Sequence, residues 1–335
     1  NEFLNNTGFN EHENEKFLPH IFKESGYITA QIGKLEWGFS TTAERLEKHG
    51  WDYHYGYYDH VRCHGFYPPF LFENGEKVNI PGNTHADCGN HFEWETPENF
   101  EKRHNMEGKS VYSQDIFNQK IIDFLRQNKD QNFFLYHPSQ IPHGQISVPV
   151  LHPAVKELNE LTHYEKEYAS MIMRLDDTVG MIMDELEELG IADDTMVIFA
   201  ADNGHEVYYL QEGRSSGRKK DLEGNSLDNI TTRFETELCG DVFNGNDGMA
   251  GLKFSSWEGG VKIPYIVHWP EKVKAGKTSD RLIANYDTMT TMADLLNIEL
   301  SEEKDGCSFL AELIDDENNL EENDYYFTID ATTWE

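Results

Sequence analysis

Apolar residues recur along this chain in two alternating patterns. Side chains spaced three or four positions apart predict amphipathic helices at 15–26, 110–130, 162–190 and 285–297. Short apolar runs predict strands at 27–33, 132–137, 195–201, 263–269 and 324–330. Strands that alternate with helices form a mostly parallel sheet with helices on both faces. The predicted class is therefore α/β, and because no clear linker interrupts residues 1–335 we expect a single domain.

Two long segments show neither pattern. Residues 39–109 are rich in turns and aromatic clusters, and residues 207–247 look like a long polar insert. The stretch "WDYHYGYYDHVRCHGFYPPF" (51–70) suits two explanations equally, rings that stack on a sugar or an aromatic core beneath a loop. The single basic island could reach an anionic glycan, although a surface loop is the default expectation for Arg214, Arg218, Lys219 and Lys220.

The charge of the chain excludes several kinds of partner. Its 335 residues hold 28 Lys and Arg against 61 Asp and Glu, a formal net charge of −33. Nucleic-acid binding needs a basic surface, and anionic membranes attract basic segments, so we expect neither partner. The four cysteines show no CxxC spacing, which argues against a structural zinc site. Nothing in the sequence indicates an oligomeric state.

Reactive groups follow or precede four of the predicted strands. Ligands of α/β sheets bind beyond the carboxyl ends of parallel strands. Lys34 and His143 follow the first two strands, Asp202 and Asn203 follow the third, and Lys253 precedes the fourth. Two ammonium groups and a cation would hold a tetrahedral oxyanion, and an imidazole would give the leaving group a proton. The set predicts hydrolysis of a sulfate or phosphate ester, although alone each signal also suits a surface lysine, a loop histidine or an Asx turn.

Five stretches, in order, resemble blocks of the type I sulfatases, a family within the alkaline-phosphatase-like superfamily. They are "LPHIFKESGYITAQIGK", "GWDYHYGY", "FFLYHPSQIPHGQISVP", "EYASMIMRLDDTVGMIMDELEELGIADDTMVIFAADNG" and "GNDGMAGLKFSSWEGGVKIPYIVHWP". Together they extend over about residues 15–300, and it is their combination that is specific. The resemblance implies the alkaline-phosphatase-like fold and removal of sulfate from a carbohydrate or an aryl ester.

The resemblance also implies roles for individual residues. Asp202 and Asn203 would bind calcium, with magnesium as the alternative. Lys34 and Lys253 would contact sulfate oxygens, and His143 would lie against the ester oxygen. Substrate contacts are expected from Arg62, His64, His205 and Trp257, of which His205 and Trp257 equally suit loop structure and packing. The partner would be a sulfated small molecule or glycan, and members of the family are mostly exported, so a periplasmic or secreted location is expected.

The chain departs from the family in its nucleophile. Type I sulfatases use a hydrated formylglycine, made from Cys or Ser in a C/S-x-P/A-x-R motif, and no such motif occurs here. The Asp-Asp metal pair of the family is also missing, and Glu36 stands where many members have His. The nucleophile and the Asp pair normally lie upstream of such a segment. We therefore expect a sulfatase that lacks its N-terminal and part of its C-terminal portion, and that does not turn over as an isolated chain.

Two other functions fit the same residues. A phosphodiesterase or phosphonate hydrolase of the same superfamily shares the metal and lysine positions. A non-catalytic relative that binds glycans would explain the missing nucleophile. The spacing of Lys34, His143, Asp202 and Lys253 favours an enzyme over a binding protein.

Overall fold

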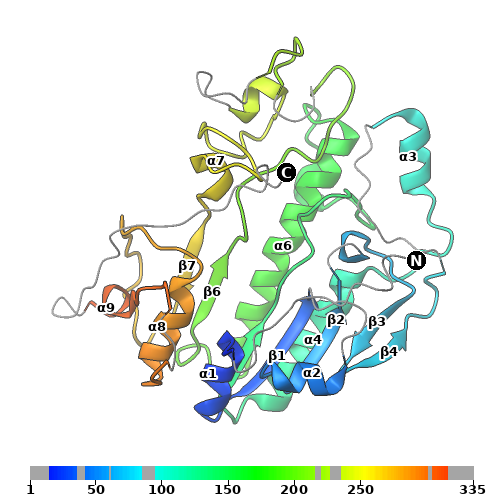
Figure 1. Ribbon diagram of the computed structural model, residues 1–335. Helices are drawn as coiled ribbons and strands as arrows, with labels where there is room; N and C mark the ends of the chain where they lie inside the picture. The colour runs from blue at the N-terminus through cyan, green and yellow to red at the C-terminus, as the bar shows by residue number, and fades with distance from the viewer. Residues whose placement is uncertain are drawn as a thin grey trace.

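The computed structural model of the chain describes residues 15–35, 42–59, 62–84, 95–215, 220–226, 235–300 and 304–315. Five of the described strands form one sheet, in the order β4-β3-β2-β1-β5 (Figure 1). Their bounds are β1 Ile28–Lys34, β2 Tyr53–Tyr57, β3 Phe70–Glu73, β4 Glu76–Asn79 and β5 Phe133–Tyr136. β1 pairs in parallel with β2 and β5, whereas β3 pairs antiparallel with β2 and β4.

The remaining two described strands, β6 (Val197–Ala200) and β7 (Tyr265–His268), form an antiparallel pair of their own. The α/β class is confirmed. The sheet is mixed, and its parallel part is the central group β2-β1-β5. β1 is central in this group and its burial pattern is almost continuous, as expected of a strand covered on both faces. The carboxyl ends of these three strands share one edge of the sheet.

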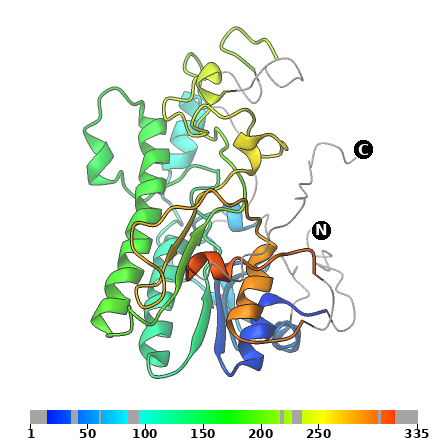
Figure 2. The same ribbon diagram turned by 90° about the vertical axis from the view of Figure 1, so that its left-hand side faces the viewer.

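Helices lie on both sides of the strands (Figure 2). α4 (Ser113–Asn128) contacts β1 and β2 and packs against α6 (His163–Glu188), while α1 (Leu18–Glu24) contacts β1, β5 and α8 (Asp287–Leu295). α6 begins with a capping box, in which Thr162 accepts from the N–H of Glu165 and the Glu165 carboxylate accepts from the N–H of Thr162. The shorter elements are α2 Ala43–Lys48, α3 Pro97–His104, α5 Pro153–Lys156, α7 Glu258–Val261, α9 Leu310–Leu313, η2 Arg62–His64 and η3 Thr236–Cys239.

The two segments without a clear sequence pattern contain much of the core. Residues 51–70 include β2 and its aromatic side chains are largely buried, so packing rather than an open stacking surface explains Tyr55, Tyr57, Tyr58, Phe66 and Tyr67. Residues 207–210, expected to begin a polar insert, are buried in the same cluster as Tyr168 and Met171. The predicted strand 324–330 and the residues Glu36, Arg218 and Lys219 lie outside the described residues. None of the described helices is long and apolar enough to cross a bilayer.

Candidate active site

The carboxyl end of β1 is built on close backbone contacts that require glycine. A Cβ on Gly33, whose φ is +140°, would lie 2.4 Å from the carbonyl oxygen of Pro138, and one on Gly56 would lie 1.7 Å from the carbonyl oxygen of Gly33. The N–H of Lys34 donates to the same Pro138 oxygen at 3.0 Å. Lys34 is thereby held beside the segment that follows β5 and carries His143.

His143 packs between two aromatic rings from other parts of the chain. The ring of His64 is stacked on it, with centroids 3.9 Å apart and planes inclined by 7°, and the ring of Tyr208 lies 4.9 Å away. Gln140 fixes this arrangement, because its buried amide donates to the carbonyl oxygens of Cys63 and Gly65 at 2.5 and 3.0 Å. The loop after β5 and the turn η2 therefore form one unit that brings the two imidazoles together.

Lys253 reaches the same place from a loop packed on the end of β6. Its backbone N–H donates to the carbonyl oxygen of His205 at 2.8 Å, and its Nζ lies 3.3 Å from the hydroxyl of Tyr208. Glycines allow this loop to pack backbone against backbone: a Cβ on Gly204 would lie 2.0 Å from the carbonyl oxygen of Gly259. The Glu-Gly-Gly sequence is thus a packing requirement that fixes Lys253 relative to the strand end.

The electrostatics of His143 depend on its burial and on side chains from other segments. Burial lowers the pKa of His143 to about 3, and interactions with Lys253, His64 and Lys34 lower it further. Its Nδ1 contacts the carbonyl oxygen of Gly144, which can only accept, so Nδ1 carries the proton and Nε2 is the acceptor. At neutral pH the site therefore holds a neutral imidazole next to two ammonium groups, and an anion would be attracted to it.

Asp202 and Asn203 follow β6, the strand that pairs with β7. Asp202 is exposed, and its charge adds to burial in raising the pKa of Tyr136 at the end of β5. The side-chain N–H of Asn203 donates to the carbonyl oxygen of Gly204 at 2.9 Å, which leaves its side-chain oxygen as an acceptor. A carboxylate and an amide oxygen side by side are the donors that calcium and magnesium prefer. The two residues fit part of a divalent-cation site.

Comparison with known proteins identifies the family. The sulfatase family model matches residues 2–298. The chain belongs to the sulfatase family. Human N-acetylgalactosamine-6-sulfatase is 28% identical over 308 residues, 90% of this chain and 49% of the relative. The N-acetylgalactosamine-6-O-sulfatase of Bacteroides thetaiotaomicron is 31% identical over 190 residues, 56% of this chain and 31% of the relative.

A solved structure shows the same fold. It comes from work on glycosaminoglycan metabolism by Bacteroides thetaiotaomicron, is 23% identical, and superposes with a TM-score of 0.59 over 91% of this chain and 65% of the other. The alkaline-phosphatase-like fold expected of a sulfatase is confirmed. The chain spans about half the length of the curated sulfatase that it matches first.

Three other residues that were expected to contact the substrate have neighbours different from those of His143. Nε2 of His205 lies 3.2 Å from Oδ2 of the buried Asp241, and the ring fills the space above Gly245, where a Cβ would approach it to 2.4 Å. This contact supports the Lys253 loop. The guanidinium carbon of Arg62 lies 5.7 Å from the ring centroid of Phe70. Trp257 is 42% exposed at the start of α7. Substrate contacts by Arg62, His64, His205 and Trp257 stay predictions.

Three residues that shape the site were not predicted from the sequence. Tyr208 contacts both His143 and Lys253, Gln140 fixes the turn of His64, and Asp241 binds His205. The hydroxyl of Tyr209 also donates to Asp241, and these contacts keep the pKa of the Asp241 carboxyl low despite burial. The apolar run of residues 207–210 directly after the metal motif was the available signal that this segment enters the core.

Proposed function

We propose that this chain supplies the sulfate-binding and leaving-group side of a sulfatase acting on sulfated carbohydrates. The observation that carries the proposal is the convergence of Lys34, Lys253 and His143 at one edge of the sheet. The molecule has a net charge of −33, so a local pair of ammonium groups is what would draw an anionic ester to this position.

Each residue has a distinct task in this proposal. Lys34 and Lys253 donate hydrogen bonds to the sulfate oxygens and stabilise the charge that develops on them. Burial depresses the pKa of His143 most and the lysine charges depress it further; a bound anion would offset the lysine charges, raise this pKa and favour a protonated imidazole. That proton lies on Nε2, where it is available to the departing ester oxygen.

Asp202 and Asn203 would hold the divalent cation with their side-chain oxygens. When bound, this cation supplies positive charge that polarises the sulfate group. The family uses a formylglycine nucleophile, and the sequence has no Cys or Ser in the corresponding motif. No residue of this chain is therefore assigned as the nucleophile, and we expect the isolated chain to bind sulfate esters without turning them over.

The names of two curated relatives support a more specific proposal for the substrate. These relatives, from human and Bacteroides thetaiotaomicron, are named for removal of the 6-sulfate of N-acetylgalactosamine. We infer that the substrate is a glycan carrying a 6-O-sulfated hexosamine, met in the periplasm or outside the cell. Nucleic acid and anionic membranes do not fit the charge.

The full-length product of the gene that encodes this chain tests the proposal. It is incubated with 6-O-sulfated N-acetylgalactosamine, its 4-O-sulfated isomer and the 6-phosphate, with calcium present, and released sulfate and phosphate are measured by ion chromatography. We expect sulfate release from the 6-O-sulfated sugar. Release of phosphate alone would indicate the other superfamily hydrolases, and sugar binding without any release would indicate a non-catalytic protein.

A further inference from the structure

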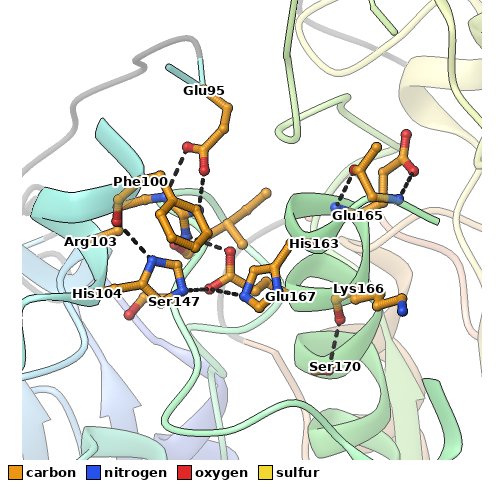
Figure 3. A network of polar contacts seen from close by, with 12 residues as sticks. Glu95, Phe100, Arg103, His104, Ser147, His163, Glu165, Lys166, Glu167 and Ser170 are labelled. Carbon is orange, nitrogen blue, oxygen red and sulfur yellow. Dashed lines mark hydrogen bonds and ion pairs between the residues drawn. The ribbon is translucent and has the colours of Figure 1, made fainter. Parts of the chain in front are cut away.

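A group of two imidazoles and a carboxylate, which shares no residue with the candidate active site, lies between α3 and the first turns of α6 (Figure 3). His104 ends α3, and His163 and Glu167 lie one helical turn apart at the start of α6. Nε2 of His104 lies 3.1 Å, and Nε2 of His163 lies 4.0 Å, from the same oxygen, Oε1 of Glu167. Three possible ligand atoms from two helices therefore converge on one point.

The tautomer of His104 identifies which of its ring nitrogens could bind a metal. Its Nδ1 lies 2.7 Å from the backbone carbonyl oxygen of Phe100, which can only accept a hydrogen bond. Nδ1 therefore carries the proton of the neutral ring, and the lone pair of Nε2 faces the carboxylate oxygen of Glu167. Two acceptors at 3.1 Å repel each other unless a proton or a metal cation lies between them.

The other carboxylate oxygen of Glu167 is already bound. Nη1 of Arg103 lies 2.6 Å from Oε2 of Glu167, while Nε and Nη2 of Arg103 bind the carboxylate of Glu95 at 3.1 and 2.6 Å. Metal-binding carboxylates and imidazoles are usually oriented by such outer hydrogen bonds, a carbonyl on the far nitrogen of the histidine and a donor on the far oxygen of the carboxylate. The carbonyl of Phe100 plays this part for His104, and the ion pair with Arg103 holds the far oxygen of Glu167.

We propose that His104, His163 and Glu167 bind a transition-metal ion, with zinc as the expected occupant. Two imidazole nitrogens and one carboxylate oxygen are zinc ligands, and in a tetrahedral site two such atoms lie about 3.3 Å apart. The pair formed by His104 and Glu167 meets this spacing, and the exposed ring of His163 closes the rest of the gap by rotation. Glu167 is 4% exposed while His104 and His163 are 35% and 47% exposed, so water completes the coordination from the open side.

The proposed site would attach α3, a helix that is not packed into the core, to α6. α3 has no buried residue, and its aromatic Phe100 is 37% exposed and packs on the ring of His104 at 4.0 Å. Its contacts with α6 include those of Arg103, whose guanidinium also lies 4.4 Å from the ring centroid of Tyr164, of His104, and of Phe100, whose ring lies 5.4 Å from that of His163. A zinc ion at this point would join two helices whose ligands are far apart in sequence, and would fix α3 against α6.

Zinc titration of the full chain tests the proposal. Chain freed of metal with a chelator is titrated with zinc by calorimetry, in excess calcium so that sites of hard oxygen ligands are filled. Wild type is compared with His163→Ala, with the His104→Ala, His163→Ala double variant, and with His268→Ala as the matched control, since His268 is an exposed histidine on β7. We expect one zinc equivalent in wild type and His268→Ala, bound at least about tenfold more weakly by His163→Ala and lost in the double variant.

A second measurement separates lost binding from lost folding. Because His163 is 47% exposed, His163→Ala should unfold at the same temperature as wild type when no metal is present. Added zinc should raise Tm for wild type and His268→Ala but not for the double variant. Cobalt in place of zinc should give the visible absorption of a tetrahedral site in wild type. Equal zinc isotherms for wild type and the double variant would overturn the proposal and leave the cluster as an ion pair bridged by a proton.

Discussion

Two groups of histidines in this molecule have opposite electrostatic surroundings. His143 is buried near Lys34 and Lys253, and these neighbours help to lower its pKa to about 3. His104 and His163 instead face the carboxylate of Glu167. The same side chain is thus kept neutral and near cations in one place, which suits an anion, and is directed at an anion in the other, which suits a cation. The neighbours, rather than the histidine itself, decide the chemistry.

The largest effect should come from removing a cation of the anion-binding group. In the full-length gene product, Lys253→Ala should lower kcat/KM for sulfate release by about 10²–10³, because the sulfate oxygens lose a donor that acts in the transition state. Lys262→Ala, an exposed lysine just after α7, is the matched control and should keep wild-type activity. Zinc binding by both variants should be unchanged. A Lys253→Ala enzyme within about twofold of wild type would contradict the assignment.

A smaller effect should follow from pushing the end of β1 away from the loop that follows β5. Gly33→Ala places a Cβ 2.4 Å from the carbonyl oxygen of Pro138 at a φ of +140°, so it should lower the free energy of unfolding by about 2–3 kcal/mol. Gly180→Ala is the control, since nothing lies within 4 Å of a Cβ there, and should raise stability by about 0.5–1 kcal/mol. Urea unfolding measures both. If Gly33→Ala proves as stable as wild type, the close approach of β1 to the loop after β5 is not as described.

The remaining effect develops only as the pH falls, and it concerns the proton of His143. Its pKa is about 3 in the folded chain and ordinarily about 6.5, so as pH falls the unfolded chain binds this proton first. His143 should therefore lower stability progressively between about pH 6.5 and pH 3, and His143→Gln should flatten this part of the profile. NMR of the labelled imidazole should show no titration between about pH 5 and pH 7, and added sulfate should raise the midpoint. A midpoint near the ordinary value without sulfate would remove the basis of the comparison.

The sequence predicted the regular elements well where a pattern had room to repeat. The long helix at 162–190 and the strand at 27–33 are present as α6 and β1, because a 26-residue amphipathic helix and a buried strand leave clear signatures. The pattern failed at residues 39–109, where β2, β3 and β4 are only four or five residues long. β5, β6 and β7 are as short, but each of them is an apolar run, whereas β2 and β4 mix apolar residues with polar residues or glycine.

The residues of the candidate site also fall into those that the sequence could predict and those that it could not. Lys34, His143, Asp202 and Lys253 could be proposed from the sequence because each adjoins a strand or a glycine turn, and strand ends are where α/β folds bind ligands. Tyr208, Gln140 and Asp241 could not, since their contacts join segments that are distant in sequence. The neutral state of His143 likewise depends on burial and on lysines contributed by two other segments.

The sequence by itself determined the family, the α/β class and the residue types able to hold a sulfate group and a cation, because these depend on local patterns and on motifs in order. Only the tertiary structure decided which of those residues meet. It placed the two imidazoles of His64 and His143 in a stack, tied His205 to Asp241, and brought His104 to the carboxylate of Glu167. Distances between side chains from separate elements follow from packing, which no local pattern records.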